Sequence, residues 1–190
     1  LTLQTLWALQ PGMRVPVLTG LDGSAGLVVD GFSQVFKVIC LLGAILSVLV
    51  SFKSLEVEKA WTGEYFTFIT FAVFGMMVMA SGVDLLTLWV GLETMALSVY
   101  VLAAYLRRRE HSVEGATKYF LLGAFSSGLY LYGASLIYGA TGTVQLGGIR
   151  EALASRIGAG GVEGVGFPLG AGLVVLAVAL LFKAALVPFH

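Results

Sequence analysis

The chain has 190 residues, of which 58% are hydrophobic and only 12% are charged, and its formal net charge is zero. Ordinary soluble domains carry about 25% charged residues, and a soluble domain of this length could not bury so much apolar surface. The composition therefore indicates an all-α, polytopic membrane protein, and the neutral charge balance gives no support for nucleic-acid binding. A transmembrane β-barrel is excluded, because runs such as VICLLGAILSVLV do not alternate between apolar and polar residues.

Residues 1–30 are mixed in character and rich in Gly and Pro, which predicts an external loop or hairpin. Five apolar stretches follow, each long enough to cross a hydrocarbon core of about 30 Å at about 1.5 Å per residue. We expect transmembrane helices over 31–52, 64–82, 84–106, 113–139 and 167–189. The chain opens without Met and ends on VPFH in mid-pattern, so we expect it to be a fragment of a longer protein.

The connector between the last two spans is Gly-rich and carries apolar residues at helical spacing, namely Leu146, Ile149, Leu153 and Ile157. Two interpretations stay open: a short helix at the membrane surface, or an ordinary loop with one helical turn.

Orientation follows from the cationic cluster RRREH at 107–111, which the positive-inside rule places on the cytoplasmic side. The alternation of spans then puts 53–63 inside, and both 1–30 and 140–166 outside.

Ionisable residues inside the spans are the main functional candidates, because a Lys, Arg or Asp at a span centre costs roughly 2.5–3.5 kcal/mol. Glu93 lies nine residues after Asp84, or about 14 Å along the helix, near the membrane midplane. Lys118 lies five residues after Val113, about 8 Å inside the cytoplasmic face. The structural alternatives are a buried acid that hydrogen-bonds to a neighbouring helix for Glu93 and a snorkelling side chain for Lys118.

The third and fourth spans are joined by a short turn and must pack antiparallel. Glu93 and Lys118 therefore approach the same depth from opposite ends, and the long lysine stem makes an ion pair between them geometrically allowed.

Lys183 lies about 22 Å along the last span, counted from Pro168. Five residues later, Pro188 cannot donate a backbone hydrogen bond, so we expect the helix to break near it. A buried lysine beside a broken helix is typical of ion-conducting sites, where freed carbonyls and water can serve the ammonium. The alternatives are a snorkelling lysine for Lys183 and a relay group or a loop residue for His190.

No His or Cys cluster has the spacing of a metal, haem or iron–sulfur site, and no Gly-rich loop fits a nucleotide. The sequence therefore predicts a chain without a cofactor or metal site and without redox chemistry. A buried acid and buried lysines suit the movement of ions or protons instead.

Residues 88–143, LWVGLETMALSVYVLAAYLRRREHSVEGATKYFLLGAFSSGLYLYGASLIYGATGT, closely resemble subunit N of respiratory complex I, the proton-pumping NADH–quinone oxidoreductase. LLFKAALVPFH at 180–190 is similar to the broken-helix motif of the same family. GLVVDGFSQVFKVICLLG resembles its third transmembrane helix with the external hairpin before it. The resemblance implies that residues 31–190 form the first part of an antiporter-like proton-translocation domain, without the family's early helices and its second, inverted half.

The resemblance also implies roles for individual residues. Glu93 matches the family's acid on helix 5, Lys118 its lysine on helix 6, and Lys183 its central lysine on the broken helix 7, with His190 as a possible relay. It further implies a multi-pass protein of the bacterial inner membrane, in contact with lipid, protons and the other membrane subunits of complex I. NADH, FMN, iron–sulfur clusters and a quinone would belong to other subunits.

Two rival interpretations remain. A subunit of a multisubunit sodium–proton antiporter or of a membrane-bound hydrogenase shares this ancestry, and either would keep Glu93 and Lys183. A purely structural scaffold predicts instead that the buried charges can be neutralised without loss of function.

The orientation gives a first testable prediction. Single cysteines at Arg108 and Gly147, in a chain whose Cys40 is replaced by serine, should react with a membrane-impermeant thiol reagent from opposite faces, the former from the cytoplasm. Labelling of both positions from one face would show that the number of spans between them is wrong.

Overall fold

A computed structural model describes residues 14–19, 25–58, 63–107 and 109–186. The chain divides into two compact units, Leu1–Gly82 with Val90–Phe120 and Val83–Trp89 with Leu121–His190. Helices α4 (Leu85–Ala103) and α5 (Glu110–Thr141) contribute to both units. Arg108, Pro188 and His190 lie outside the described residues.

The predicted all-α membrane fold is confirmed, since four described helices are long and apolar enough to cross a membrane. They are α2 (Gly31–Val57), α3 (Gly63–Ser81), α4 and α5. The fifth predicted span is shorter than expected: α7 (Phe167–Lys183) has 17 residues and ends at Lys183 instead of continuing to 189.

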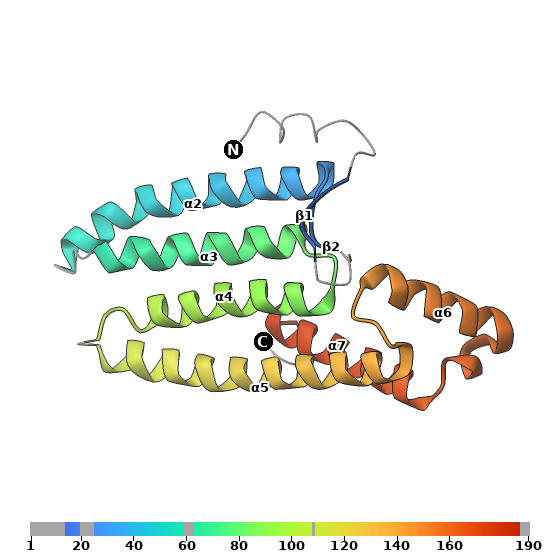
Figure 1. Ribbon diagram of the computed structural model, residues 1–190. Helices are drawn as coiled ribbons and strands as arrows, with labels where there is room; N and C mark the ends of the chain where they lie inside the picture. The colour runs from blue at the N-terminus through green and yellow to red at the C-terminus, as the bar shows by residue number, and fades with distance from the viewer. Residues whose placement is uncertain (1–13, 20–24, 59–62, 108, 187–190) are drawn as a thin grey trace. The chain divides into compact units, whose positions relative to one another are not determined.

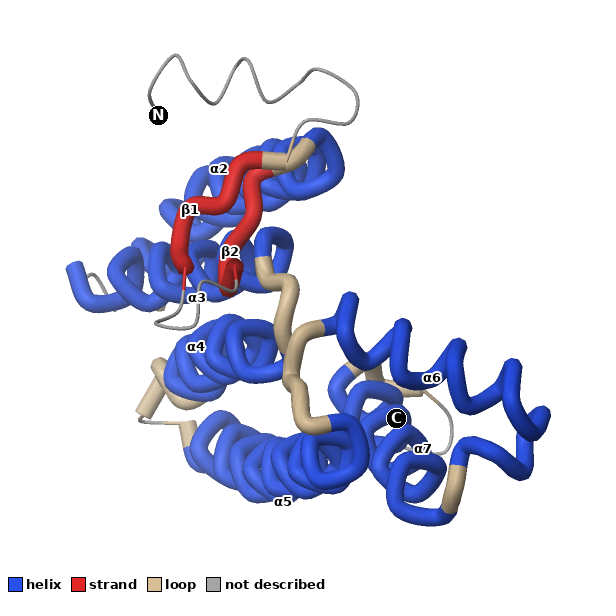
Figure 2. Tube along the Cα trace, turned by 45° about the vertical axis from the view of Figure 1, so that its right-hand side comes forward, coloured by secondary structure: helices blue, strands red, loops and turns tan. Residues whose placement is uncertain are grey.

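A β-hairpin occupies part of the first thirty residues. Strands β1 (Val15–Thr19) and β2 (Ala25–Val29) pair antiparallel, and Leu27 forms a bridge with Gly82, just after α3. Figure 2 shows the hairpin, in red, lying across the ends of α2 and α3. The division of the chain into 1–30 and 31–190 stays a prediction.

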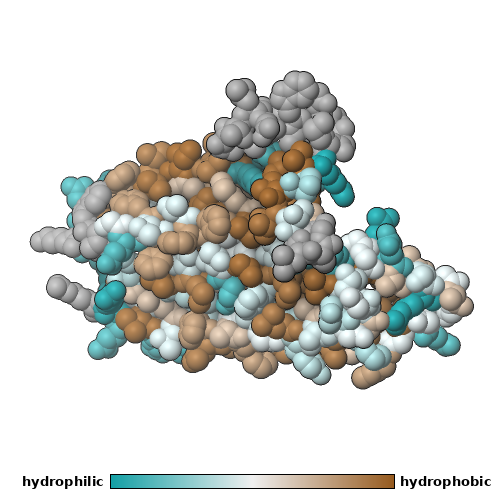
Figure 3. Space-filling view, viewed as in Figure 1, coloured by the Kyte–Doolittle hydropathy of each residue, from teal (hydrophilic) through white to brown (hydrophobic). Residues whose placement is uncertain are grey.

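Helix α2 begins at a capping box and then exposes almost its whole surface. The Asp30 carboxylate accepts a hydrogen bond from the Ser33 amide at 2.9 Å, and the Ser33 hydroxyl accepts one from the Asp30 amide at 3.0 Å. These contacts satisfy two of the donors that a helix start leaves open. Beyond the cap, exposed apolar side chains cover α2 (Figure 3), among them Phe32, Leu42, Leu46 and Val50. A surface of this kind requires lipid or other apolar helices around it.

Two glycines bring α3 and α4 into close contact in the first unit, while α2 and α3 lie side by side (Figure 1). A Cβ on Gly75 would stand 2.5 Å from the Met95 amide nitrogen and 2.6 Å from the Gly91 carbonyl oxygen. A Cβ on Gly91 would stand 2.8 Å from the Met79 amide nitrogen. Small residues at such crossings let helix backbones approach in lipid, where burial of apolar surface gives little driving force.

In the second unit, glycines likewise allow the backbones of α5 and α7 to approach closely. A Cβ on Gly133 would stand 2.8 Å from the Leu176 amide nitrogen, and one on Gly172 would stand 3.1 Å from the Gly133 carbonyl oxygen. Leu169 and Ile137 are fully buried beside this crossing and belong to the core of the unit.

Hydroxyl groups on α5 form hydrogen bonds to neighbouring segments of the second unit. Ser126 donates to the Ala179 carbonyl of α7 at 3.0 Å, and Tyr130 donates to the Leu85 carbonyl at 3.0 Å. Ser127 accepts from the Trp89 indole at 2.9 Å. All three hydroxyls serve packing between segments of the unit, as polar groups commonly do between transmembrane helices.

The connector after α5 contains a helix, so the loop interpretation of this segment is wrong. Helix α6 (Leu146–Gly160) is followed by the short 3₁₀ helix η1 (Gly161–Val165), and Ile149 points into the core. Arg156 returns from α6 to donate to the Ala140 carbonyl at 2.6 Å and to the Val165 carbonyl at 3.3 Å. Its guanidinium thus binds a carbonyl in the last turn of α5, where a cation is favoured.

The crossing of α3 and α4 can be tested with one methyl group. Gly75→Ala should destabilise the folded subunit by about 1–3 kcal/mol, because the new Cβ meets backbone atoms that cannot move aside easily. The measurement is the thermal midpoint of the intact complex that contains the chain. The matched control is Gly43→Ala on α2, where a Cβ meets nothing within 4 Å and stability should hold or rise slightly. Equal midpoints for the two variants would contradict the close approach.

Candidate functional site

Glu93 lies in the middle of an apolar helix, as the sequence predicts. It is the ninth residue of α4, which has 19 residues, and its side chain is half-buried. The ten residues from Glu93 to the helix end at Ala103 correspond to about 15 Å. This depth is beyond the reach of a short carboxylate that remains solvated by snorkelling.

The close contact with α3 determines which way Glu93 faces. Gly91 touches α3, and Glu93 follows by two residues, a rotation of about 200° at 3.6 residues per turn. Glu93 therefore lies on the side of α4 that is turned away from α3. Tyr100, two turns further along, shares this side and interacts electrostatically with Glu93.

The face of α4 that carries Glu93 is the face that packs on α5. The Tyr100 ring is buried and lies edge-on to Tyr119 with a centroid distance of 4.6 Å, and to Phe120 with one of 5.8 Å. Ser112, in the first turn of α5, donates to the Ala103 carbonyl at 2.6 Å and ties the two helices together at their connection. The acid is thereby directed toward the helix that carries Lys118.

Lys118 has a different partner from the one predicted. Its ammonium nitrogen lies 2.6 Å from a carboxylate oxygen of Glu114, one turn earlier on α5, and both side chains are largely exposed. An exposed pair with this spacing is worth about 0.3–0.5 kcal/mol. The predicted pairing with Glu93 is therefore not the one observed. The glutamate–lysine spacing in EGATK is a sequence signal for the observed pair.

The depths of Glu93 and Lys118 are nevertheless similar. Helix α5 begins at Glu110, three residues before the predicted start at Val113, so Lys118 lies eight residues, or about 12 Å, into the helix. The corresponding depth of Glu93 from the same end of the helix pair is about 15 Å. The two residues belong to one unit, and they stand at nearly the same level on adjacent helices.

Lys183 is the last residue of α7, in the second unit, and its side chain is half-buried. The helix ends there in a Schellman motif: the Leu186 amide donates to the Leu181 carbonyl at 3.1 Å, and the Ala185 amide to the Phe182 carbonyl at 3.0 Å. A helix C-terminus carries partial negative charge, which favours a cation such as Lys183.

Helix α7 ends nearer to Lys183 than the sequence analysis predicts. Ala185 adopts the left-handed conformation, with φ of 50°, three residues before Pro188. In a continuous helix, residue 188 would donate a hydrogen bond to the carbonyl of Ala184, the C-cap of α7. A proline cannot donate this bond, and its ring would clash with that carbonyl. The break expected near Pro188 stays a prediction, and alanine gives no sequence signal that marks position 185 as the end of α7.

Comparison with known proteins identifies the family. Residues 82–190 match the family described as NADH:quinone oxidoreductase/Mrp antiporter, transmembrane. The chain is 43% identical, over its whole length, to NADH-quinone oxidoreductase subunit N 1 of Koribacter versatilis, and 44% identical over 93% of its length to subunit N 2 of Solibacter usitatus. It covers 37% and 34% of these relatives, so the chain spans about a third of their length.

Solved structures agree with this assignment. Respiratory complex I from Thermus thermophilus with bound aureothin contains a chain that is 36% identical, with a TM-score of 0.70 over 98% of this chain and 36% of that one. The membrane-bound sulfane sulfur reductase, an archaeal respiratory membrane complex, gives 25% identity and a TM-score of 0.77, over 98% of this chain and 37% of that one. The half-buried acid Glu93, the lysine at similar depth and the apolar helix that ends at Lys183 thus occur in a chain that belongs to the NADH:quinone oxidoreductase/Mrp antiporter transmembrane family.

Proposed function

We propose that the chain is part of a membrane subunit of NADH–quinone oxidoreductase and carries a section of a proton path driven by quinone reduction. The observation that carries this proposal is the position of Glu93, an acid at the centre of an apolar helix on the face that packs against α5. The relatives named subunit N support the assignment to this complex.

In this proposal, Lys118 exchanges partners during turnover. Its pair with Glu114 is weak, about 0.3–0.5 kcal/mol, so a small change in the surroundings can release the lysine. Glu93 is the acid at similar depth on the adjacent helix and is its alternative partner. Because an opposite charge nearby changes the proton affinity of a buried group, making and breaking this pair would load and unload protons.

Lys183 is the proposed second station of the path. The negative end of α7 favours its ammonium, and a lysine, unlike an arginine, can lose its proton when it is buried. One elementary charge that crosses a 100 mV membrane is worth about 2.3 kcal/mol. The proposed station must therefore bind and release its proton against a free-energy difference of that order in each cycle.

The remaining assignments are proposals that rest on the resemblance to subunit N rather than on contacts within the chain. We propose that this chain is non-redox, and that NADH, FMN, iron–sulfur clusters and the quinone bind to other subunits. The proposed partners are the other membrane subunits, the lipid bilayer and protons, in a bacterial inner membrane. Pro188 and His190 lie outside the described residues, and a relay role for His190 stays a prediction.

The second candidate is a subunit of an ion antiporter, which the family description names beside NADH:quinone oxidoreductase. Sodium would then replace or accompany protons. Proton pumping that persists in sodium-free vesicles supports the first candidate, and a strict requirement for sodium supports the second.

Glu93 is tested by removing its charge while its shape is kept. In the intact complex, Glu93→Gln should lower proton pumping several-fold, because glutamine cannot ionise, and Glu93→Asp should retain more pumping. The measurement is proton uptake per NADH oxidised in vesicles, with assembly checked by co-purification of the other subunits.

The matched control is Glu151→Gln on α6, where the same chemical change falls on an exposed residue and should leave pumping unchanged. Parent-like pumping by Glu93→Gln in an assembled complex would show that the acid is structural.

Lys183 is tested with a cation that keeps its charge. Lys183→Arg should assemble, since charge and most of the packing remain, yet pump poorly, because arginine stays protonated. Lys183→Ala should also pump poorly. A lysine that only anchors the helix predicts the opposite result for arginine, because arginine anchors equally well.

The matched control for Lys183→Arg is Lys37→Arg, a half-buried lysine of α2 near the end of a predicted span. It should pump like the parent. If Lys183→Arg does the same, Lys183 does not belong to the proton path.

A further inference from the structure

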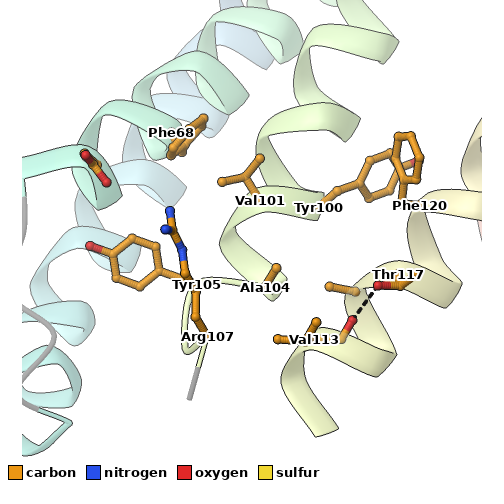
Figure 4. Close-up of a pocket in the computed structure, with 11 residues that line it drawn as sticks. Phe68, Tyr100, Val101, Ala104, Tyr105, Arg107, Val113, Thr117 and Phe120 are labelled. Atoms are coloured by element: carbon orange, nitrogen blue, oxygen red, sulfur yellow. Dashed lines mark hydrogen bonds between the residues drawn. The ribbon is translucent and has the colours of Figure 1, made fainter. Parts of the chain in front are cut away.

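A pocket of about 560 Å³ opens among α3, α4 and the start of α5, entirely within the first unit (Figure 4). Its size falls in the range of about 300–1,000 Å³ that is usual for small-molecule sites. The pocket lies at the end of α4 that leads into the 107–111 cluster, so the predicted orientation puts it at the cytoplasmic boundary of the membrane.

The walls of the pocket are mainly apolar. Phe68 of α3, Val101 of α4 and Phe120 of α5 are among the residues that line it. Figure 4 shows the Phe68 and Val101 side chains on one side and the Phe120 ring on the other. A lining of this kind, at this depth, favours a hydrocarbon chain over bulk water.

Two opposite charges also line the pocket. Glu64 lies in the first turn of α3, and Arg107 lies between α4 and α5, with its side chain extended toward Phe68 in Figure 4. Both residues are exposed, and neither forms an ion pair with another described residue. Their neighbours differ in this respect: Arg109 binds Glu58, and Lys118 binds Glu114.

We propose that this pocket binds a zwitterionic aminophospholipid, namely phosphatidylethanolamine. The Arg107 guanidinium receives the phosphate, with which it can form two parallel hydrogen bonds, and the Glu64 carboxylate accepts hydrogen bonds from the primary ammonium. One acyl chain lies along Phe68, Val101 and Phe120.

Charge complementarity selects this headgroup over the other common ones. A choline headgroup keeps the positive charge but has no N–H to donate to Glu64. A glycerol headgroup has no cation and brings an anionic lipid next to that carboxylate. Glu64 therefore sets the preference for phosphatidylethanolamine, and Arg107 strengthens the binding of every phospholipid.

The test uses photoreactive lipids with the intact membrane complex that contains the chain. The probes are phosphatidylethanolamine and phosphatidylcholine, each with a diazirine in one acyl chain, and cross-linked peptides are mapped by mass spectrometry. In the parent complex we expect stronger cross-linking of phosphatidylethanolamine to the segments around Phe68 and Val101. Arg107→Gln should lower cross-linking of both lipids about tenfold or more, the value of a hydrogen bond to a charged group.

The decisive comparison is Glu64→Gln, which should abolish the preference between the two lipids while cross-linking persists. Ala104→Phe fills the pocket and leaves both charges in place, so it should block both probes equally. Arg150→Gln and Glu151→Gln, on exposed positions of α6, are the matched controls and should change nothing. Equal cross-linking of the two lipids in the parent complex, or none at these segments because protein fills the pocket, would overturn the proposal.

Discussion

The close approach of α3 and α4 through Gly75 and Gly91 is the constraint on which the candidate site depends. Apolar helices gain little by hiding from lipid, so their association rests on direct packing and on interhelical hydrogen bonds. Once one face of α4 is committed to α3, the helical repeat places Glu93 on the opposite side. Gly133 and Gly172 do the same for α5 and α7 in the second unit. Glycines at the helix crossings, which carry no functional group, thus determine which way the ionisable side chains on the same helices face.

Most of the fold could be predicted from hydropathy, because a helix of apolar residues is the simplest way to satisfy backbone groups in lipid. Helices α2, α3, α4 and α5 therefore lie close to their predicted ranges. The prediction was weakest where composition was mixed. Apolar residues at helical spacing left both a helix and a loop open for α6, because that spacing does not show the tertiary contacts of the helix, such as the burial of Ile149 and the Arg156 guanidinium on the Ala140 carbonyl.

The sequence could predict how deep the residues of the candidate site lie in the membrane, but not which of them form an ion pair. The position of Glu93 follows from counting residues at a fixed rise, so sequence alone places it near the centre of its helix. The partner of Lys118 depends on a choice between two acids, Glu114 one turn away and Glu93 across the helix pair, and depth in the membrane points only to the second. A local ion pair needs no tertiary structure to form, so the nearer acid was the simpler prediction.

The alanine at the break of α7 has a consequence for how firmly that break is fixed. A left-handed conformation costs a residue with a Cβ roughly 1–2 kcal/mol more than it costs glycine. The observed end of α7 is therefore less favoured over a continued helix than it would be with glycine at position 185. About 1.4 kcal/mol corresponds to a factor of ten in an equilibrium constant. The equilibrium constant between the observed helix end and a continued helix is therefore about five- to thirty-fold smaller with alanine than with glycine. The end of α7 is therefore favoured by the two hydrogen bonds of its Schellman motif and opposed by the conformation of its alanine.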